Sequence, residues 1–410
     1  MEVITLLSLV LAIFIGFKKN INTGLVSIFF AFLVGVFLLK LSAKEIISGW
    51  PTNLFFILLG MTFLFSIASV NGTLELISRK LSSFARGNTK LLPIIFFIVT
   101  AVIAAPGPGP IVATALMAPI GMALAKEEDI PEILMATMIV SGAIAGGLSP
   151  IAATGIITNT LAQEQGLNTG KTVFLTTALV GVIMALLFYI IFGGYKLKQK
   201  GKKEGVDLKF NSDQKKTFIV ILLVIVGILF FDLDIGLTAF SGAVVLLLMG
   251  VAKQDKALAA VPWSTLILVA GVAVLVNVIN IAGGIEALSN FLSSIMSERT
   301  ASAVIAIIAG LMSSVSSASG VVIPTLVPAV PNIVNQVSGS VSPYALVAAI
   351  AVGAHMVTFS PLSTLGALTL ASSKNEENKQ KLFTQLLAVG LSSVVFAGIL
   401  GLLGLYNLFI

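Results

Sequence analysis

The chain has 410 residues, of which 57% are hydrophobic and only 10% are charged. Soluble domains carry about a quarter charged residues, so this composition excludes a soluble globular protein. The sequence contains no cysteine, which excludes disulfides and cysteine-ligated zinc or iron–sulfur sites. The formal net charge of +6 does not indicate a nucleic-acid partner, because the basic residues crowd into alternate loops instead of forming one basic face.

Apolar runs of roughly 15 to 22 residues recur along the whole chain, which is the length that a hydrocarbon layer of about 30 Å requires. About ten such segments predict an all-α polytopic membrane protein. The first run, residues 4–17, is predicted to be a membrane helix and not a signal peptide. Its flanks decide this, because Lys18 and Lys19 follow it where a small-residue cleavage site would stand.

Basic residues are distributed unevenly among the predicted loops. The stretch 196–216 holds eight of the 24 Lys and Arg residues and no long apolar run, so it is predicted to be a cytoplasmic linker. Walking outward from it, 20 basic residues fall on the linker's side, and only Lys40, Lys44, Lys171 and Arg299 fall on the other. The positive-inside rule therefore places both termini outside a bacterial inner (plasma) membrane.

The segments on either side of the linker, residues 1–195 and 217–410, resemble each other at a constant offset of 211 residues. Asn71-Gly72-Thr73 aligns with Ala282-Gly283-Gly284, and Ser149-Pro150 aligns with Ser360-Pro361. Each half is predicted to contain five transmembrane helices and one re-entrant hairpin. An odd number of spans inverts the second copy relative to the first, and inverted repeats are typical of secondary transporters.

Each half is also predicted to contain an amphipathic arm at the membrane interface, followed by the hairpin and by an interrupted helix. These elements are expected at 73–87, 91–125 and 131–165 in the first half, and at 284–297, 301–336 and 343–372 in the second.

Paired breaks at membrane depth are the best indication of a binding site in the sequence. Half-helices that begin at the breaks direct partial positive charge and free N–H groups inward, and they attract an anion without any Lys or Arg. The predicted substrate-binding residues are Gly107, Pro108, Gly109, Ser149, Pro150, Ser319, Gly320, His355, Ser360, Pro361 and Ser363. Unwound carbonyls and hydroxyls can bind a small cation, and the sodium candidates are Thr154, Gly155, Ser317, Ser319 and Thr364. The alternative for any of these residues is that it only allows close helix packing.

The positions of the ionisable residues limit the transport mechanisms that the sequence supports. All 18 carboxylates fall in predicted loops, linkers, span ends or arms, which disfavours a proton pump or a cation antiporter that works through a buried carboxylate. His355, the only histidine, is a candidate substrate ligand or proton carrier, or alternatively a residue bonded within helix packing. No phosphate-binding loop, HExxH motif or catalytic triad is visible, so the chain is not expected to be an enzyme.

Asn71-Gly72-Thr73, Leu116-Met117-Ala118-Pro119-Ile120 and the run from Gly142 to Pro150 resemble the MatC-type malonate and dicarboxylate carriers. These carriers belong to the ion transporter superfamily, which also contains the divalent anion/sodium symporters. The resemblance covers nearly the whole chain, most specifically residues 50–160, and implies a homodimer with a scaffold, a moving transport domain and an elevator mechanism. Divalent anion/sodium symporters carry Ser-Asn-Thr at both hairpin tips to bind sodium and the substrate carboxylate. The tips here differ, since they read Pro-Gly-Pro-Gly-Pro and Ser-Ser-Ala-Ser-Gly.

We therefore expect an elevator-type secondary transporter that imports a small organic anion, first of all a dicarboxylate, with sodium or alternatively protons as the coupling ion. No cofactor other than the sodium ion is expected, and the expected partners are the anion, the lipid bilayer and a second copy of the chain. Two alternatives stay open: the membrane subunit of a binding-protein-dependent tripartite carrier, and an anion-selective channel.

Overall fold

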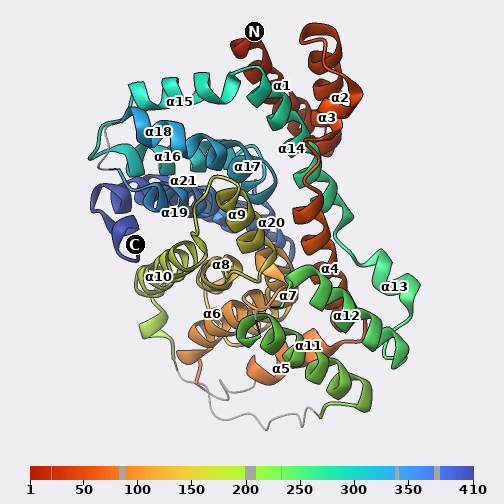
Figure 1. Ribbon diagram of the computed structural model, residues 1–410. Coiled ribbons are helices and arrows are strands. Elements are labelled where there is room, and N and C mark those ends of the chain that lie inside the picture. Colours follow the sequence, from red (N-terminus) through yellow and green to blue (C-terminus); the bar gives the residue numbers. More distant parts are fainter. Residues whose placement is uncertain (20, 83–87, 199–208, 232, 338–340, 374–378) are drawn as a thin grey trace.

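The computed structural model describes residues 1–410 except 20, 83–87, 199–208, 232, 338–340 and 374–378 (Figure 1). The described residues form helices and no strand. Seven of the helices in these ranges are long and apolar enough to cross a membrane, and five shorter apolar helices accompany them. The prediction of an all-α polytopic membrane protein is thereby confirmed, whereas the count of about ten spans stays a prediction.

The described helices of the first half are α1 (Glu2–Lys19), α2 (Thr23–Phe32) with its π-helical continuation η1 (Leu33–Leu38), α3 (Ala43–Ile47), α4 (Thr52–Val70), α5 (Thr73–Ser82), α6 (Leu91–Ala104), α7 (Gly109–Glu127), α8 (Glu132–Gly147), α9 (Ala153–Gln163), α10 (Gly170–Ile191) and the short η3 (Gly194–Lys196). Those of the second half are α11 (Ser212–Phe230), α12 (Ile235–Leu248), α13 (Gln254–Ala259), α14 (Trp263–Ile281), α15 (Gly284–Ser294), α16 (Ala301–Ser313), η4 (Ala318–Val322), α17 (Ile323–Leu326), η5 (Val327–Ala329), α18 (Val330–Gln336), α19 (Pro343–Met356), η6 (Val357–Phe359), α20 (Thr364–Ala371), α21 (Lys379–Leu402) and η8 (Leu405–Asn407).

The interrupted helices lie at the centre of the bundle. Every residue of α8 from Ile133 to Gly147 is buried, and so is every residue of α19 from Ala345 to Met356. Helices α6, α7 and α10 pack around α8, while α16 and α21 pack on α19. The two helices that lead into the breaks are therefore enclosed by protein, which is where interrupted helices at membrane depth are tolerated.

Two close crossings join helices of opposite halves. Gly24 of α2 lies directly against the backbone of α14 at Gly271, and Gly60 of α4 lies against the Gly236 carbonyl of α12, which would stand 2.8 Å from a Cβ at Gly60. Gly60 and Gly271 are separated by the same 211 residues as the matched sequence segments. An inverted repeat requires such paired crossings, although the repeat itself stays a prediction.

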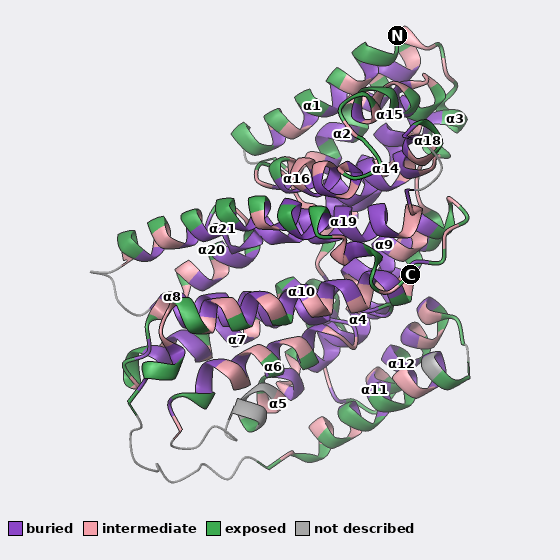
Figure 2. Cartoon of the chain, turned by 90° about the vertical axis from the view of Figure 1, so that its left-hand side faces the viewer, coloured by how far each residue is buried: buried purple, intermediate pink, exposed green. Residues whose placement is uncertain are grey.

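Large apolar side chains cover the outside of the bundle. Exposed residues run along α1, α11, α12 and α21 (Figure 2), and they include Leu222 and Leu223 of α11 and Leu391 and Val395 of α21. Such a surface is unfavourable in water and favourable against lipid tails. The helices therefore present the side-chain chemistry of a membrane protein to their surroundings.

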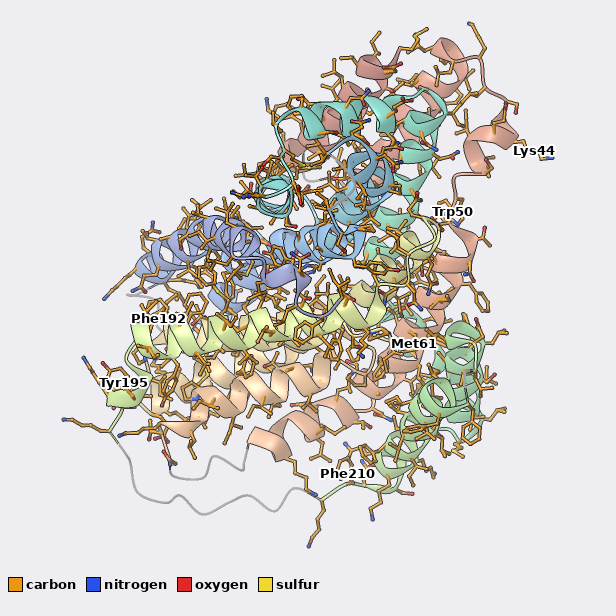
Figure 3. The ribbon with its side chains drawn as sticks, turned by 60° about the vertical axis from the view of Figure 1, so that its left-hand side comes forward. Lys44, Trp50, Met61, Phe192, Tyr195 and Phe210 are labelled. Atoms are coloured by element: carbon orange, nitrogen blue, oxygen red, sulfur yellow. The ribbon has the colours of Figure 1, made fainter. Side chains whose placement is uncertain are left out.

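Both termini lie on the same side of the molecule, to the right in Figure 2. In Figure 3 the residues that follow α10, Phe192 and Tyr195, lie on the opposite side of the molecule from Lys44 and Trp50. The predicted arrangement of loops requires this separation. The predicted linker 196–216 and the predicted arm 73–87 lie partly outside the described residues, at 199–208 and 83–87.

Asn71 fastens the start of α5 to α11. Its Nδ2 donates to Thr217 Oγ1 at 2.7 Å, and its Oδ1 accepts from the Thr73 N–H at 3.1 Å and from Thr73 Oγ1 at 2.6 Å. Because a hydrogen-bond partner lost from a buried group costs roughly 1–3 kcal/mol, we expect Asn71→Ala to lower the free energy of unfolding by about that amount. Thermal melting of the purified protein in detergent measures the change. Asn168→Ala, at an exposed position, should melt like the wild type, and equal losses in both variants would contradict the role of Asn71.

Candidate functional site

One cavity of about 350 Å³ brings the four predicted breaks of the fold together. Its walls are the first turns of α7, α9 and α20, the tip between α16 and η4, and the end of α19. The turn between α1 and α2 and the first turn of α14 close it from the other side. Binding pockets for small molecules have volumes of about 300–1,000 Å³, so the space fits a small organic molecule.

Six of the predicted site residues line this cavity. They are Thr154, Ser317, Ser319, His355, Ser363 and Thr364. The other nine predicted residues do not line it: Gly107, Pro108, Gly109, Ser149, Pro150, Gly155, Gly320, Ser360 and Pro361. The cavity thus contains most of the predicted sodium candidates and two substrate candidates that are not also sodium candidates.

The N-terminus of α20 opens into the cavity. Its N-cap residue Ser363 is extended (φ −105°, ψ 158°) and makes no capping hydrogen bond with its side chain. The next N–H groups, of Thr364 and Leu365, come too early in the helix to find an acceptor within it. These donors, the Ser363 hydroxyl and the helix dipole form a site suited to a carboxylate.

Hydroxyl groups of the second hairpin tip form the adjacent wall. Ser317 Oγ accepts from the Gly320 N–H at 3.1 Å, which leaves its own proton and a lone pair free for a ligand. Ser316 Oγ donates to the Met312 carbonyl at 2.6 Å, so its proton is committed to the protein. Together with Ser319, these residues give the tip three side-chain oxygens at the cavity wall.

His355 is the only titratable side chain among the described residues that line the cavity. The ring is buried, and its Nδ1 lies 2.8 Å from the Ala351 carbonyl oxygen. Since a carbonyl only accepts, Nδ1 carries a proton, and Nε2 is the atom left for the cavity. Nε2 accepts a hydrogen bond when the ring is neutral and donates one to an anion when the ring is protonated.

Five polar residues that line the cavity are not among the predicted site residues: Asn22, Thr23, Ser264, Ser316 and Thr358. Asn22 Nδ2 donates to the Ser264 carbonyl at 2.8 Å and to Ser264 Oγ at 3.0 Å, and Asn22 Oδ1 accepts from the Gly24 N–H at 2.9 Å. These hydrogen bonds hold Asn22, the N-cap of α2, against the first turn of α14. An Asn directly before an apolar helix is a capping signal. That signal predicts the helix start but not a partner 242 residues away.

The family resemblance is supported by a match over the first 147 residues. Residues 1–147 match the family model of the dicarboxylate carrier protein MatC N-terminus. The predicted resemblance to MatC-type carriers is confirmed over these residues. No curated protein matches the sequence significantly.

The fold is similar to that of a solved transporter. The crystal structure of the YdaH transporter from Alcanivorax borkumensis, described as having an unusual topology, superposes with a TM-score of 0.61. The match covers 87% of this chain and 86% of that one at 14% sequence identity, which establishes similarity of fold alone. Family model and fold together point to a multi-pass membrane transporter, not an enzyme.

Proposed function

We propose that this protein is a secondary transporter that imports a small dicarboxylate by symport with sodium. The observation that carries the proposal is the cavity where the N-terminus of α20 meets hydroxyls from both halves of the chain. No Lys, Arg, Asp or Glu is among the described residues that line it. A carboxylate held by N–H groups and hydroxyls alone is bound reversibly, which a carrier requires because it must also release its substrate.

A sodium ion fits the same cavity. Ser317, Ser319 and Thr364 offer hydroxyl oxygens, and sodium needs only oxygen ligands. A cation bound there would also neutralise part of the charge on a neighbouring carboxylate. The sequence resemblance to dicarboxylate carriers supports the substrate class, while the hydroxyl-rich tip supports the coupling ion.

Uptake by the purified protein in liposomes tests the proposal. With an inward sodium gradient we expect labelled succinate or malonate to accumulate above its external concentration, and an equal potassium gradient should not support this. An anion channel would equilibrate the substrate without accumulation. The membrane subunit of a tripartite carrier would be inactive without its binding protein, and either result would overturn the proposal.

We place both termini outside the cell and the linker 196–216 in the cytoplasm. The support is the distribution of basic residues and the common side of the two termini in Figure 2. Because the chain has no cysteine, single-cysteine labelling needs no background removal. In intact cells we expect an impermeant maleimide to label Ser297→Cys but not Ser212→Cys, both exposed positions. The opposite pattern would reverse the orientation.

We further propose that the chain works as a homodimer with an elevator mechanism. The close crossings of α2 with α14 and of α4 with α12 suit a rigid scaffold, and the buried helices α8 and α19 with their hairpins suit a transport domain. Light scattering of the detergent-solubilised protein should give the mass of two chains. A monomeric mass with full transport activity would remove the dimer from the proposal.

A further inference from the structure

The two halves differ at the positions that face the cavity. Side-chain oxygens are present in the second half where the aligned residues of the first half have none. Ser316, Ser317, Ser319, Ser363 and Thr364 stand where the first half has Ala105, Pro106, Pro108, Ala152 and Ala153. The hydroxyls that could hold a cation are therefore concentrated on one side of the pseudo-repeat.

Hydrogen bonds from the interrupted helix reach two carbonyl oxygens at the first hairpin tip, those of Ala105 and Gly107. The tip, Pro106 to Pro110, has no side-chain oxygen, so a cation there would depend on backbone carbonyls. The Ser149 hydroxyl donates to the Ala105 carbonyl, and the Ala153 N–H donates to the Gly107 carbonyl at 3.2 Å. Each of these two oxygens already accepts a hydrogen bond across the break, which leaves it one lone pair fewer for a cation.

Side chains also fill the space around the first tip. The ring of Phe65, from α4, lies directly on Gly107, so that a Cβ at Gly107 would collide with it. On the other side, the Pro110 ring would stand 2.8 Å from a Cβ at Gly147. Gly107 and Gly147 are thus closely packed, and of the tip only Pro110 lines the cavity.

The two hydrogen bonds at the first tip have no counterparts among the described residues of the second half. At the same offset they would join Ser360 Oγ to the Ser316 carbonyl and the Thr364 N–H to the Ala318 carbonyl, and neither bond exists among the described residues. Ser360 Oγ instead accepts from the Leu362 N–H at 3.2 Å, within its own turn. The Ser317 and Ala318 carbonyls accept hydrogen bonds within their own helix, whereas the hydroxyl residues of the second tip and of the start of α20 line the cavity.

We infer that the protein binds one coupling cation per substrate molecule, at the second hairpin tip and the start of α20. The first break is a structural junction, in which the Ser149 hydroxyl and the Ala153 N–H replace the cation. This inference rests on the proposed sodium-coupled transport. It departs from the sodium binding at both tips that the resemblance to divalent anion/sodium symporters implies.

The charge carried per cycle follows from this count. One sodium ion moving inward with a doubly charged dicarboxylate carries one net negative charge. An inside-negative membrane potential, which opposes the entry of negative charge, should therefore slow succinate uptake at neutral pH. Two sodium ions would make uptake insensitive to the potential, and three would make an inside-negative potential accelerate it. Uptake under a potassium–valinomycin clamp separates these cases, and either of the last two results would overturn the inference.

Equilibrium binding of radioactive sodium to the full-length purified protein tests the site without transport. We expect one sodium ion per chain, a Hill coefficient near one, and a roughly tenfold weaker affinity in Thr364→Val. Ser149→Ala should still bind one ion per chain, although its melting temperature should fall because the Ala105 carbonyl loses its donor. Two ions per chain, or loss of binding in Ser149→Ala but not in Thr364→Val, would overturn the inference.

Thr364→Ser is the matched control, since it keeps the hydroxyl and should keep the sodium affinity. Comparable melting temperatures for the two Thr364 variants separate a lost ligand from a lost fold. Sodium-driven uptake with two bound ions would overturn this inference and leave the proposed function standing. Uptake that ignores sodium, together with no sodium bound, would overturn both.

Discussion

Ser363→Leu should abolish dicarboxylate uptake while leaving the fold intact. Ser363 is the N-cap of α20, and its side chain is partly exposed to the cavity without a capping bond of its own. A leucine there would cover the free N–H groups of Thr364 and Leu365 and remove one hydroxyl. Hydrogen bonds to a charged group are worth about 1.5–3 kcal/mol each, so losing one should reduce uptake about 10- to 100-fold and losing two about 100-fold or more. Initial rates in liposomes measure the loss.

Ser360→Leu provides the contrast three residues earlier. Ser360 is 2% exposed, and its Cβ would lie 2.6 Å from a Cβ at Gly390 of α21, so there is no space for a larger side chain. Overpacking a core position costs about 1–3 kcal/mol, and we expect a lower melting temperature and poor yield. We assign Ser363 to the cavity and Ser360 to the packed core. A well-folded Ser360→Leu protein together with an active Ser363→Leu protein would contradict both assignments.

The positions of the helix breaks could be predicted because their signals are local. Pro and Gly residues inside apolar runs indicate an interruption wherever they occur. The predicted interruptions at Ser149-Pro150 and Ser360-Pro361 fall between α8 and α9 and between η6 and α20. The predicted hairpins likewise contain the tips that follow α6 and α16.

The direction of a side chain at a break could not be predicted. Ser149, Ser360 and Ser363 are all small hydroxyl residues beside a break, and only Ser363 lines the cavity. The difference depends on which neighbour packs behind each residue: the Ala105 carbonyl for Ser149 and Gly390 for Ser360. Both neighbours are distant in sequence, so no local pattern carries the information.

The cavity residues Asn22 and Ser264 could not be predicted for the same reason. Ser264 and Asn22 meet through hydrogen bonds across 242 residues, and neither belongs to a break. A comparison of the two halves position by position would have found one further feature. His355 and Thr358, which line the cavity, stand where the first half has Ile144 and Gly147.

His355 decides between sodium and proton coupling. Nδ1 is bound to the Ala351 carbonyl, so Nε2 is the atom free for a ligand, and no other described residue that lines the cavity is titratable. If sodium drives transport, the protonated ring of His355 donates a hydrogen bond from Nε2 to the anion. His355→Leu should then weaken substrate binding roughly 10- to 100-fold, because a hydrogen bond to a charged group is worth about 1.5–3 kcal/mol. His355→Gln keeps a polar group near the position of Nε2, so its loss should be smaller.

In both variants the sodium dependence should be unchanged, since the oxygen ligands of Ser317, Ser319 and Thr364 are intact. Uptake should be measured against substrate and sodium concentration, with and without an imposed pH gradient. Proton coupling gives a different set of results: wild-type uptake follows an inward proton gradient and ignores sodium, and His355→Gln loses this pH dependence. A proton pathway needs a chain of titratable groups, and a single histidine without a carboxylate partner in the cavity does not form one. For this reason we expect the sodium gradient to drive uptake and His355 to affect the substrate alone.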